Sequence, residues 1–281
     1  MLRPPSAPEQ VLDVAGAVRD ALRFPLSGPP LAQLAPRGGR ATIVVEPAAL
    51  PVPGGPQEAR QTAIAVTIQE LERCGVPDER QTILVAGGLG RRFGQSDLEQ
   101  LLSPSRARAF HGRVVVHDVE DESLVGLVDD VRVSPELVET DVVLTVTAAE
   151  SVLHGGASAF LAAADAATIR GLAAIDSLLE APGSPAWALA LRVEDALAER
   201  VPVLGVSLVL DLPRPTGRYR GYPSEGAAVE RVARSPLRTV LSMLPDGLRR
   251  DLLARTGRRL SALAAFAGRP SDAHAEALVR G

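Results

Sequence analysis

Short apolar runs alternate with longer stretches of helical spacing along most of the chain. The clearest helix is predicted over residues 58–74, where apolar side chains recur every three or four positions until Gly75. Residues 41–45 instead form a short, β-branched and almost wholly apolar run, which is typical of a strand buried on both faces. The same reasoning predicts strands at 41–45, 82–86, 114–116, 141–146, 203–210 and 261–266.

Further helices and one hairpin complete the predicted elements. Asp129 and Asp130 separate two valine-rich runs, 125–128 and 131–133, and this pattern predicts a β-hairpin. Helical segments are predicted at 11–22, 31–34, 96–102, 136–138, 157–179, 193–200 and 231–255, and from Ser271 onward. The alternation of strands and helices favours an α/β fold with a largely parallel sheet sandwiched between helices. We expect one domain over residues 1–281, with residues 43–45, 83–85, 114–116 and 142–146 as its central strands.

Composition narrows the class of protein. Of 281 residues, 46% are hydrophobic and only 3% aromatic, so the core must be aliphatic. The net charge of −4 argues against a nucleic-acid binder. An arginine-rich stretch at 249–259 is interpreted as a solvated helix face. No apolar run is long enough to span a membrane, the N-terminus lacks a signal-like apolar segment, and Cys74 is the single cysteine. We therefore expect a cytoplasmic protein.

A glycine-rich segment follows the second predicted strand. Gly87-Gly88-Leu89-Gly90-Arg91 can present backbone N–H groups to a phosphate, with Arg91 as the counter-charge. The segment is neither a P-loop nor a dinucleotide-binding fingerprint. The alternative interpretation is a tight turn between a strand and a loop. Both interpretations stay open from the sequence alone.

Ionisable residues also follow predicted strands. Glu46 and Glu150 come after the runs 41–45 and 141–146, and the carboxyl ends of parallel strands meet at one edge of a sheet. His117, beside Asp118, is a candidate acid/base; alternatively, the pair hydrogen-bonds a loop. Solvated loop carboxylates are the corresponding alternative for the two glutamates. No histidine or cysteine pair has the spacing of a helical metal site, so we expect no preformed transition-metal site.

Four stretches resemble the N-terminal domain of the nickel-pincer lactate racemases. The strongest is Ala265-Phe-Ala-Gly-Arg-Pro-Ser-Asp-Ala-His274, which is close to the family pattern Phe-Ala-Gly-x-Pro-x-x-Ala-His. Val116-His117-Asp118 is similar to a family Asn-His-Asp, and Gly75-Val-Pro77 matches a family Gly-Val-Pro that precedes a strand. The fourth stretch is 43–53, a strand followed by a proline-rich loop. The resemblance as a whole extends over about residues 10–275.

The resemblance implies where a site would lie and what it would bind. The family holds a nickel-pincer nucleotide covalently on a lysine in a segment that is similar here to His154-Gly155-Gly156-Ala157-Ser158. His154 would then be catalytic, the two glycines would bind cofactor, and Ser158 would stand at the lysine position. The expected ligand is a small hydroxy acid or a nucleotide-like molecule. One cleft is predicted to be lined by Glu46, Gly87, Gly88, Arg91 and His154.

The chain departs from the family pattern at most of its functional positions. All 30 basic residues are arginine, so no lysine can anchor the cofactor. Leu50 stands where the family has a substrate-binding arginine, Pro47 where it has aspartate, and Gly90 where it has an acid/base histidine. No histidine lies near 172–174, where the family binds nickel, and the chain ends where the family's second domain would begin.

Two hypotheses follow from these departures. The first is an enzyme of the 2-hydroxyacid racemase or epimerase type with an altered site and a non-covalent cofactor. The second is a non-catalytic binding or regulatory module, or a subunit whose site is completed by a partner chain that supplies the missing domain. The residues favour little or no racemase activity of the chain alone, whereas the family resemblance favours an enzyme.

Overall fold

The computed structural model describes most of the chain. The described residues are 13–47, 58–88, 101–172, 183–211, 220, 225–235, 243–244 and 261–281. The chain divides into two compact units, of which the first comprises Met1–Leu50, Ala59–Leu210 and Ser261–Gly281. The second comprises Pro51–Glu58 and Asp211–Leu260, and contains helix α10 (Gly226–Ala233). The single domain expected over residues 1–281 stays a prediction.

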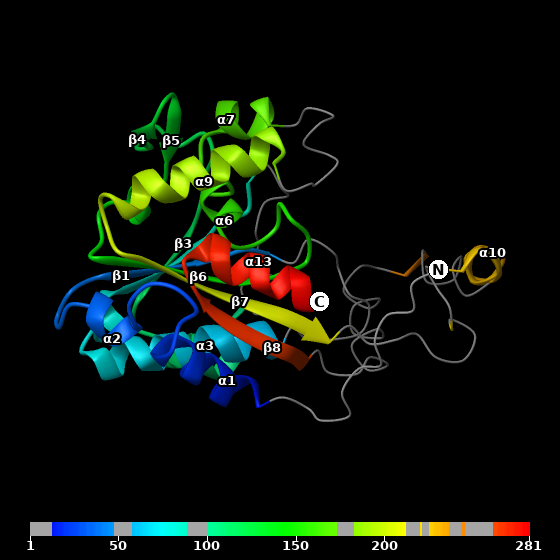
Figure 1. Ribbon diagram of the computed structural model, residues 1–281, viewed down its shortest axis with the longest axis horizontal. Coiled ribbons are helices and arrows are strands. Elements are labelled where there is room, and N and C mark those ends of the chain that lie inside the picture. Colours follow the sequence, from blue (N-terminus) through cyan, green and yellow to red (C-terminus); the bar gives the residue numbers. More distant parts are fainter. Residues whose placement is uncertain are drawn as a thin grey trace. The chain divides into compact units, whose positions relative to one another are not determined.

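A six-stranded sheet forms the centre of the first unit (Figure 1). Its order is β3-β2-β1-β6-β7-β8, and the neighbouring pairs from β3 to β7 are all parallel. Strand β8 runs against β7, because Pro270, just after β8, lies beside Gly205 near the beginning of β7. The strands are β1 (Ala41–Val45), β2 (Gln81–Val85), β3 (Arg113–Val116), β6 (Val142–Ala148), β7 (Val203–Asp211) and β8 (Ser261–Gly268). The α/β class with a mostly parallel sheet is therefore confirmed.

The register brings the ends of the central strands to one edge. Val45 pairs with Val85 of β2 on one side and with Val146 of β6 on the other. The segments that follow β1, β2 and β6 therefore leave the sheet side by side. This edge carries Glu46 after β1 and, further along the chain, Glu150 after β6.

Helices cover both faces of the sheet (Figure 1). Alternate side chains of β1 enter opposite cores, Ile43 on one face and Val44 on the other. The core of Ile43 contains residues of α1 (Val14–Arg23), α2 (Leu31–Leu34) and α3 (Glu58–Cys74). The core of Val44 contains residues of α6 (Ser158–Leu161), α9 (Pro185–Ala198) and the hairpin of β4 (Val125–Val128) and β5 (Val131–Val133). The C-terminal helix α13 (Pro270–Arg280) packs against β8 and α9.

The sequence pattern identified most elements, with three corrections. Strand β3 is an edge strand rather than a central one, and its Val114 and Val116 are 39% and 41% exposed. The helical region predicted at 157–179 begins as two short helices: α6 ends at Leu161, and α7 (Ala166–Gly171) begins anew with Asp165 as its N-cap. Helix α9 begins at Pro185, earlier than predicted, with Ser184 as its N-cap. Three short helices complete the described elements: η1 (Asp78–Arg80), α5 (Pro104–Ala109) and η2 (Pro135–Leu137).

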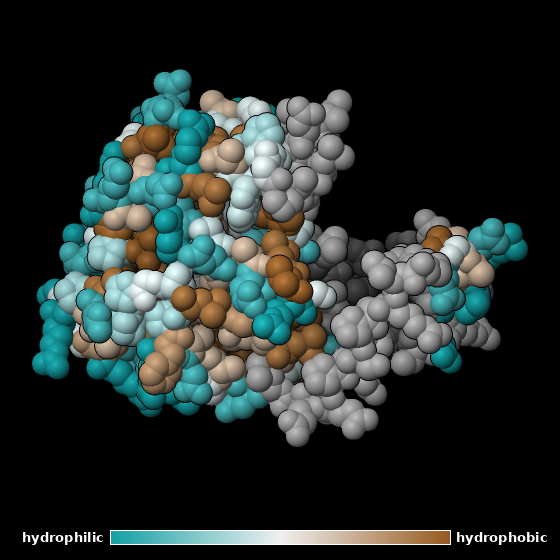
Figure 2. Space-filling model, viewed as in Figure 1, coloured by the Kyte–Doolittle hydropathy of each residue, from teal (hydrophilic) through white to brown (hydrophobic). Residues whose placement is uncertain are grey.

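Some predictions fall on residues that are not described. The helix predicted at 96–102 lies almost wholly outside the described residues, as does the part of 231–255 that follows Ser235, Met243 and Leu244 excepted. No helix in the described part of the chain is long and apolar enough to cross a membrane. Over the described surface in Figure 2, hydrophilic and hydrophobic residues are interspersed.

Candidate functional site

Four ionisable side chains converge at the carboxyl edge of β1 and β6. Glu46 directly follows β1, Glu150 and His154 follow β6, and Arg60 comes from the first turn of α3. The side chains of Glu46, Arg60 and Glu150 are 5%, 6% and 10% exposed, and that of His154 is 22% exposed. We refer to these four residues as the carboxyl-edge cluster. Since ligands of parallel α/β sheets bind at this edge, the cluster is the candidate site.

The imidazole of His154 lies between the two carboxylates. Its Nε2 is 3.4 Å from Glu150 Oε2 and 2.9 Å from the carbonyl oxygen of Pro47, and its Nδ1 is 3.9 Å from Glu46 Oε1. Glu150 is also paired with Arg60, whose Nη2 is 2.5 Å from Glu150 Oε1. The cluster is therefore one continuous chain of charged and hydrogen-bonding groups from Arg60 to Glu46.

Burial governs the electrostatics of Glu46. Desolvation raises the pKa of this carboxyl above its ordinary value; His154 and Arg60 oppose that rise and Glu150 adds to it. Its Oε2 atom is buried and has no hydrogen-bond partner among the described residues. A carboxyl in this position retains a proton more readily than an exposed one. It is thus a candidate proton donor or acceptor at the edge of the sheet.

The loop that carries His154 depends on two glycines. Gly155 and Gly156 have φ of +113° and +58°, a region that other residues rarely adopt. The N–H of Gly156 donates a hydrogen bond of 3.0 Å to Thr147 Oγ1 on β6. A Cβ on Gly155 would lie 2.8 Å from His274 Nδ1, so the loop is packed directly against α13. The glycines therefore have a structural role here, and their predicted cofactor-binding role stays a prediction.

His274 joins the C-terminal helix to the same loop. Its Nε2 is 2.9 Å from the carbonyl oxygen of Ser151, and its ring centroid is 6.3 Å from that of Trp187. The side chain is fully buried, and this burial lowers the pKa of the imidazole. Neutral His274 donates through Nε2 and so holds the beginning of the His154 loop in place.

Ion pairs fix α13 against α9. Arg269, which precedes α13, lies 3.2 Å from Glu194 Oε1 through Nε and 2.5 Å from Asp195 Oδ1 through Nη2. Glu194 is fully buried, and desolvation raises its pKa even though Ser271 and Arg269 bind it. These contacts position His274, and through it the loop that bears His154.

The glycine segment after β2 borders the same edge. A Cβ on Gly87 would lie 4.0 Å from Pro47 Cγ, and the N–H of Gly88 donates a 3.0 Å hydrogen bond to the carbonyl oxygen of Ala162. Gly88 has φ of +54°, consistent with a tight turn. Arg91, the proposed counter-charge for a phosphate, lies outside the described residues. The phosphate-binding role of this segment stays a prediction.

His117 and Asp118 do not pair with each other. His117 Nε2 is 2.8 Å from the carbonyl oxygen of Ala164, and Asp118 Oδ1 accepts a 3.0 Å hydrogen bond from the N–H of Glu120. Burial lowers the pKa of the His117 imidazole. This geometry matches the alternative in which both side chains hydrogen-bond a loop. Their role in catalysis stays a prediction.

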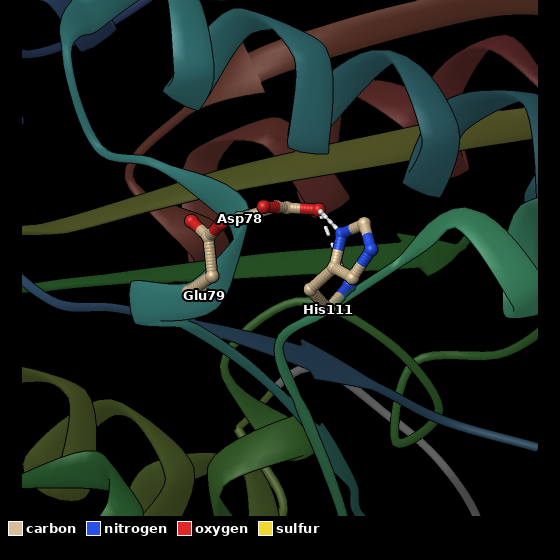
Figure 3. A group of neighbouring side chains, drawn as sticks. All are labelled: Asp78, Glu79 and His111. Carbon is tan, nitrogen blue, oxygen red and sulfur yellow. Dashed lines mark hydrogen bonds and ion pairs between the residues drawn. The ribbon is translucent and has the colours of Figure 1, made fainter.

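A second group of ionisable residues lies at the opposite, amino edge of the sheet. Asp78 and Glu79 of η1 and His111 before β3 place their ligand atoms within 4.8 Å of one another. Figure 3 shows Asp78 and His111 pointing toward each other, with His111 Nδ1 3.1 Å from Asp78 Oδ2, and the Glu79 carboxylate beside that of Asp78. The His111 side chain is 69% exposed. Exposed groups of this kind are common without a metal, so the geometry assigns them no function.

Comparison with known proteins identifies the family. A profile of the lactate racemase N-terminal domain matches residues 1–156, more than half of the chain. The protein therefore belongs to the lactate racemase N-terminal domain family. No curated protein sequence matches the chain.

Two solved structures are similar to this one. The lactate racemase apoprotein from Thermoanaerobacterium thermosaccharolyticum has a TM-score of 0.60 and 15% identity, over 95% of this chain and 54% of that one. A Thermotoga maritima protein has a TM-score of 0.48 and 14% identity, over 69% of this chain and 49% of that one. The chain thus spans about half the length of the structures that it matches. At such identities, the first match establishes the fold and nothing more.

The residues present do not fit a nickel-pincer nucleotide attached through lysine. The chain contains no lysine, and Ser158, which the resemblance assigns to the lysine position, is 5% exposed in the first turn of α6. Ser158 Oγ is buried and has no hydrogen-bond partner among the described residues. A hydroxyl cannot replace the amine from which that link is formed. The carboxyl-edge cluster therefore remains as the candidate site among the described residues.

Two residues of this site were missed from the sequence. Arg60 occupies a helix position at which any polar residue is ordinary, so the sequence carried no signal for it. His274 was noted only as part of the resemblance to the family pattern, and its contact with Gly155 requires the fold. By contrast, Glu46, Glu150 and His154 were expected near one another, and the structure brings them together.

Proposed function

We propose that this protein is a lactate racemase-type domain that does not racemise hydroxy acids by itself and instead binds a small ligand at the carboxyl-edge cluster. The family and the fold support the assignment to a lactate racemase-type domain. Two parts of the proposal are to be tested: the absence of racemase activity, and the binding of a small ligand at the carboxyl-edge cluster. A cytoplasmic location belongs to the same proposal, and the free thiol of Cys74 supports a reducing compartment.

The environment of Ser158 is the observation that carries the proposal. Where the family resemblance expects an amine reaching into the site, a short hydroxyl is enclosed in the first turn of α6. His274 and Pro270 leave no free space beside Gly156: a Cβ on Gly156 would lie 2.5 Å from His274 Cβ and 2.7 Å from the Pro270 carbonyl oxygen. Both features support a site that holds no covalent cofactor.

A second candidate is a subunit whose site is completed by another domain, supplied by a partner chain. The match to the lactate racemase apoprotein covers 54% of that structure, and this candidate places the remainder on another chain. In this case His154, 3.4 Å from Glu150, is placed to act as an acid or base once the site is complete.

Cofactor retention tests the proposal. The full-length protein is incubated with the nickel-pincer nucleotide and dialysed; its intact mass and nickel content are then measured, with the Thermoanaerobacterium lactate racemase as the loaded control. We expect an unchanged mass and nickel at background. Nickel retained at one per chain, together with racemisation that His154→Ala abolishes, would instead establish an enzyme. Nickel retention that requires an added partner protein would favour the second candidate.

A further inference from the structure

Strand β3 presents an unpaired main chain at one edge of the central sheet. In a parallel strand, the N–H and C=O groups of one residue point to the same side, and successive residues alternate. The N–H of His117 donates to the carbonyl oxygen of Val85 on β2, so the main-chain groups of Val114 and Val116 point away from β2. No hydrogen bond reaches those outward groups from the part of the chain that the structure describes.

This edge lacks the features by which proteins usually protect an edge strand. Its four residues, Arg113–Val116, include no proline, and its pairing with β2 has no register shift that would mark a bulge. Val114 and Val116 are 39% and 41% exposed, so apolar side chains flank the unpaired main chain. At the opposite edge, by contrast, the N–H of Leu26 donates a 2.7 Å hydrogen bond to the carbonyl oxygen of Ala267 on β8. The edge of β3 is therefore a template for one more strand.

Contacts at both ends hold β3 in an extended conformation. Before the strand, Asp78 Oδ2 accepts a hydrogen bond from the N–H of His111 and lies 3.1 Å from its ring Nδ1 (Figure 3). Gly112 packs so closely on η1 that a Cβ there would overlap the carbonyl oxygen of Asp78. After the strand, His117 Nε2 is 2.8 Å from the carbonyl oxygen of Ala164. Because the strand is already ordered, pairing with another strand costs little conformational entropy.

The sequence of β3 is complementary to itself in the antiparallel direction. About a two-fold axis through Val115, each Val114 lies opposite a Val116 of the second copy, and their outward main-chain groups form the hydrogen-bonded pairs of an antiparallel ladder. Val115 then faces its own copy in a non-hydrogen-bonded pair. Arg113, which is paired with Glu136 at 2.8 Å, would face a His117 that burial keeps neutral by lowering its pKa. No like charges therefore meet in this register.

We propose that β3 pairs with β3 of a second copy of this chain, antiparallel about a two-fold axis, so that the two six-stranded sheets become one continuous sheet. The contact closes on itself, since both copies use the same edge. A second copy is favoured over an unrelated chain because all three valines meet valines in one register. Four residues bury less surface than a standard interface, so we expect a reversible dimer with a dissociation constant of about 1–100 μM. This inference does not depend on the proposed function.

Sedimentation equilibrium of the full-length protein tests the association. From about 1 μM to about 300 μM, we expect the mean mass to rise from that of a monomer toward that of a dimer. Val116→Pro removes an outward N–H and leaves the hydrogen bonds to β2 intact, and it should raise the dissociation constant at least about tenfold. Val116→Lys, which places a charge on the edge, should act in the same direction. Val279→Lys, at an exposed valine of α13, is the control and should leave the dimer unchanged.

Cysteine cross-linking tests the register. In a Cys74→Ala background, Val115→Cys places two thiols in the non-hydrogen-bonded pair, where the Cα atoms lie about 4.5 Å apart and a disulfide can form. Oxidation with copper phenanthroline in air should then give a covalent dimer. Val114→Cys is the matched control, because its own copy is a diagonal neighbour at about 7–8 Å. We expect its cross-linking to be at least about tenfold slower.

Three results would overturn the proposal. They are a protein that stays monomeric up to about 300 μM, a dimer that Val116→Pro leaves unchanged, and cross-linking of Val114→Cys as fast as that of Val115→Cys. A monomer would leave the edge of β3 to a different chain and so contradict pairing with a second copy. If circular dichroism shows that Val116→Pro does not fold, the cross-linking pair decides the matter. None of these results bears on cofactor retention.

Discussion

The side chain of His274 occupies the space that a side chain on Gly156 would need. A Cβ on Gly156 would lie 2.5 Å from His274 Cβ, and the backbone at Gly156 has φ of +58°. His274 also binds the carbonyl oxygen of Ser151 through Nε2, at 2.9 Å. The C-terminal helix thus fixes both ends of the loop in which His154 lies.

Gly156→Ala should destabilise the protein strongly. The substitution combines an unfavourable positive φ with a contact that forces His274 or Pro270 to shift, and together these effects should lower the free energy of unfolding by about 3 kcal/mol. Urea denaturation measures the change. Gly171→Ala is the matched control, because nothing lies within 4 Å of its Cβ and its φ is not positive. Equal effects of the two substitutions would contradict the packing described here.

Loss of the Glu150 charge should also be costly. Glu150→Gln weakens the buried pair with Arg60, and removing one partner of such a pair lowers the free energy of unfolding by about 3–5 kcal/mol. Arg192→Met, which removes an exposed ion pair with Asp129, should change it by less than about 1 kcal/mol. If the two substitutions are equally mild in urea denaturation, the Arg60–Glu150 pair does not hold the cluster together.

The burial of His274 predicts a pH dependence of stability. Its folded-state pKa lies below the ordinary 6.5, so the unfolded chain binds the proton more readily below that pH. The contribution of His274 is fully present above pH 6.5 and is lost as the pH falls from 6.5 through the lowered folded value, by at most about 1.4 kcal/mol per pH unit. Denaturation of the unaltered protein and of His274→Gln between pH 5 and 8 should give curves that converge toward acid. Parallel curves would mean that His274 titrates normally.

The sequence predicted the sheet better than the order of its strands. Runs such as Ile43–Val45 have apolar side chains on both faces, which is what a parallel strand between two helical layers requires. Val114–Val116 has the same pattern but lies at the edge, because strand order depends on connections that hydrophobicity does not encode. The region 157–179 was predicted as one helical region because its many alanines give no hydrophobic periodicity that would mark a break. Asp165 begins a second helix there as its N-cap, with Oδ1 2.9 Å from the backbone N of Thr168.

The candidate site was predictable only in part, because the sequence pattern indicates which residues follow strands but not how a helix packs on the sheet. Glu46 and Glu150 follow parallel strands, so the edge at which they meet follows from fold class alone. Arg60 reaches the same point from a helix that joins β1 to β2, and its orientation depends on how α3 packs on the sheet. The pairing of Arg60 with Glu150 is therefore a property of the tertiary structure, invisible in the spacing of residues.

The most direct test of the account is whether the full-length protein racemises lactate. L-Lactate is incubated with the protein and the nickel-pincer nucleotide, and D-lactate is measured by chiral chromatography. Loss of one acid/base group alone lowers a rate by about 10²- to 10⁴-fold, and here the lysine anchor is also absent, so D-lactate should stay at the level of the protein-free control. D-Lactate formed in proportion to protein concentration, and abolished by His154→Ala, would contradict the account.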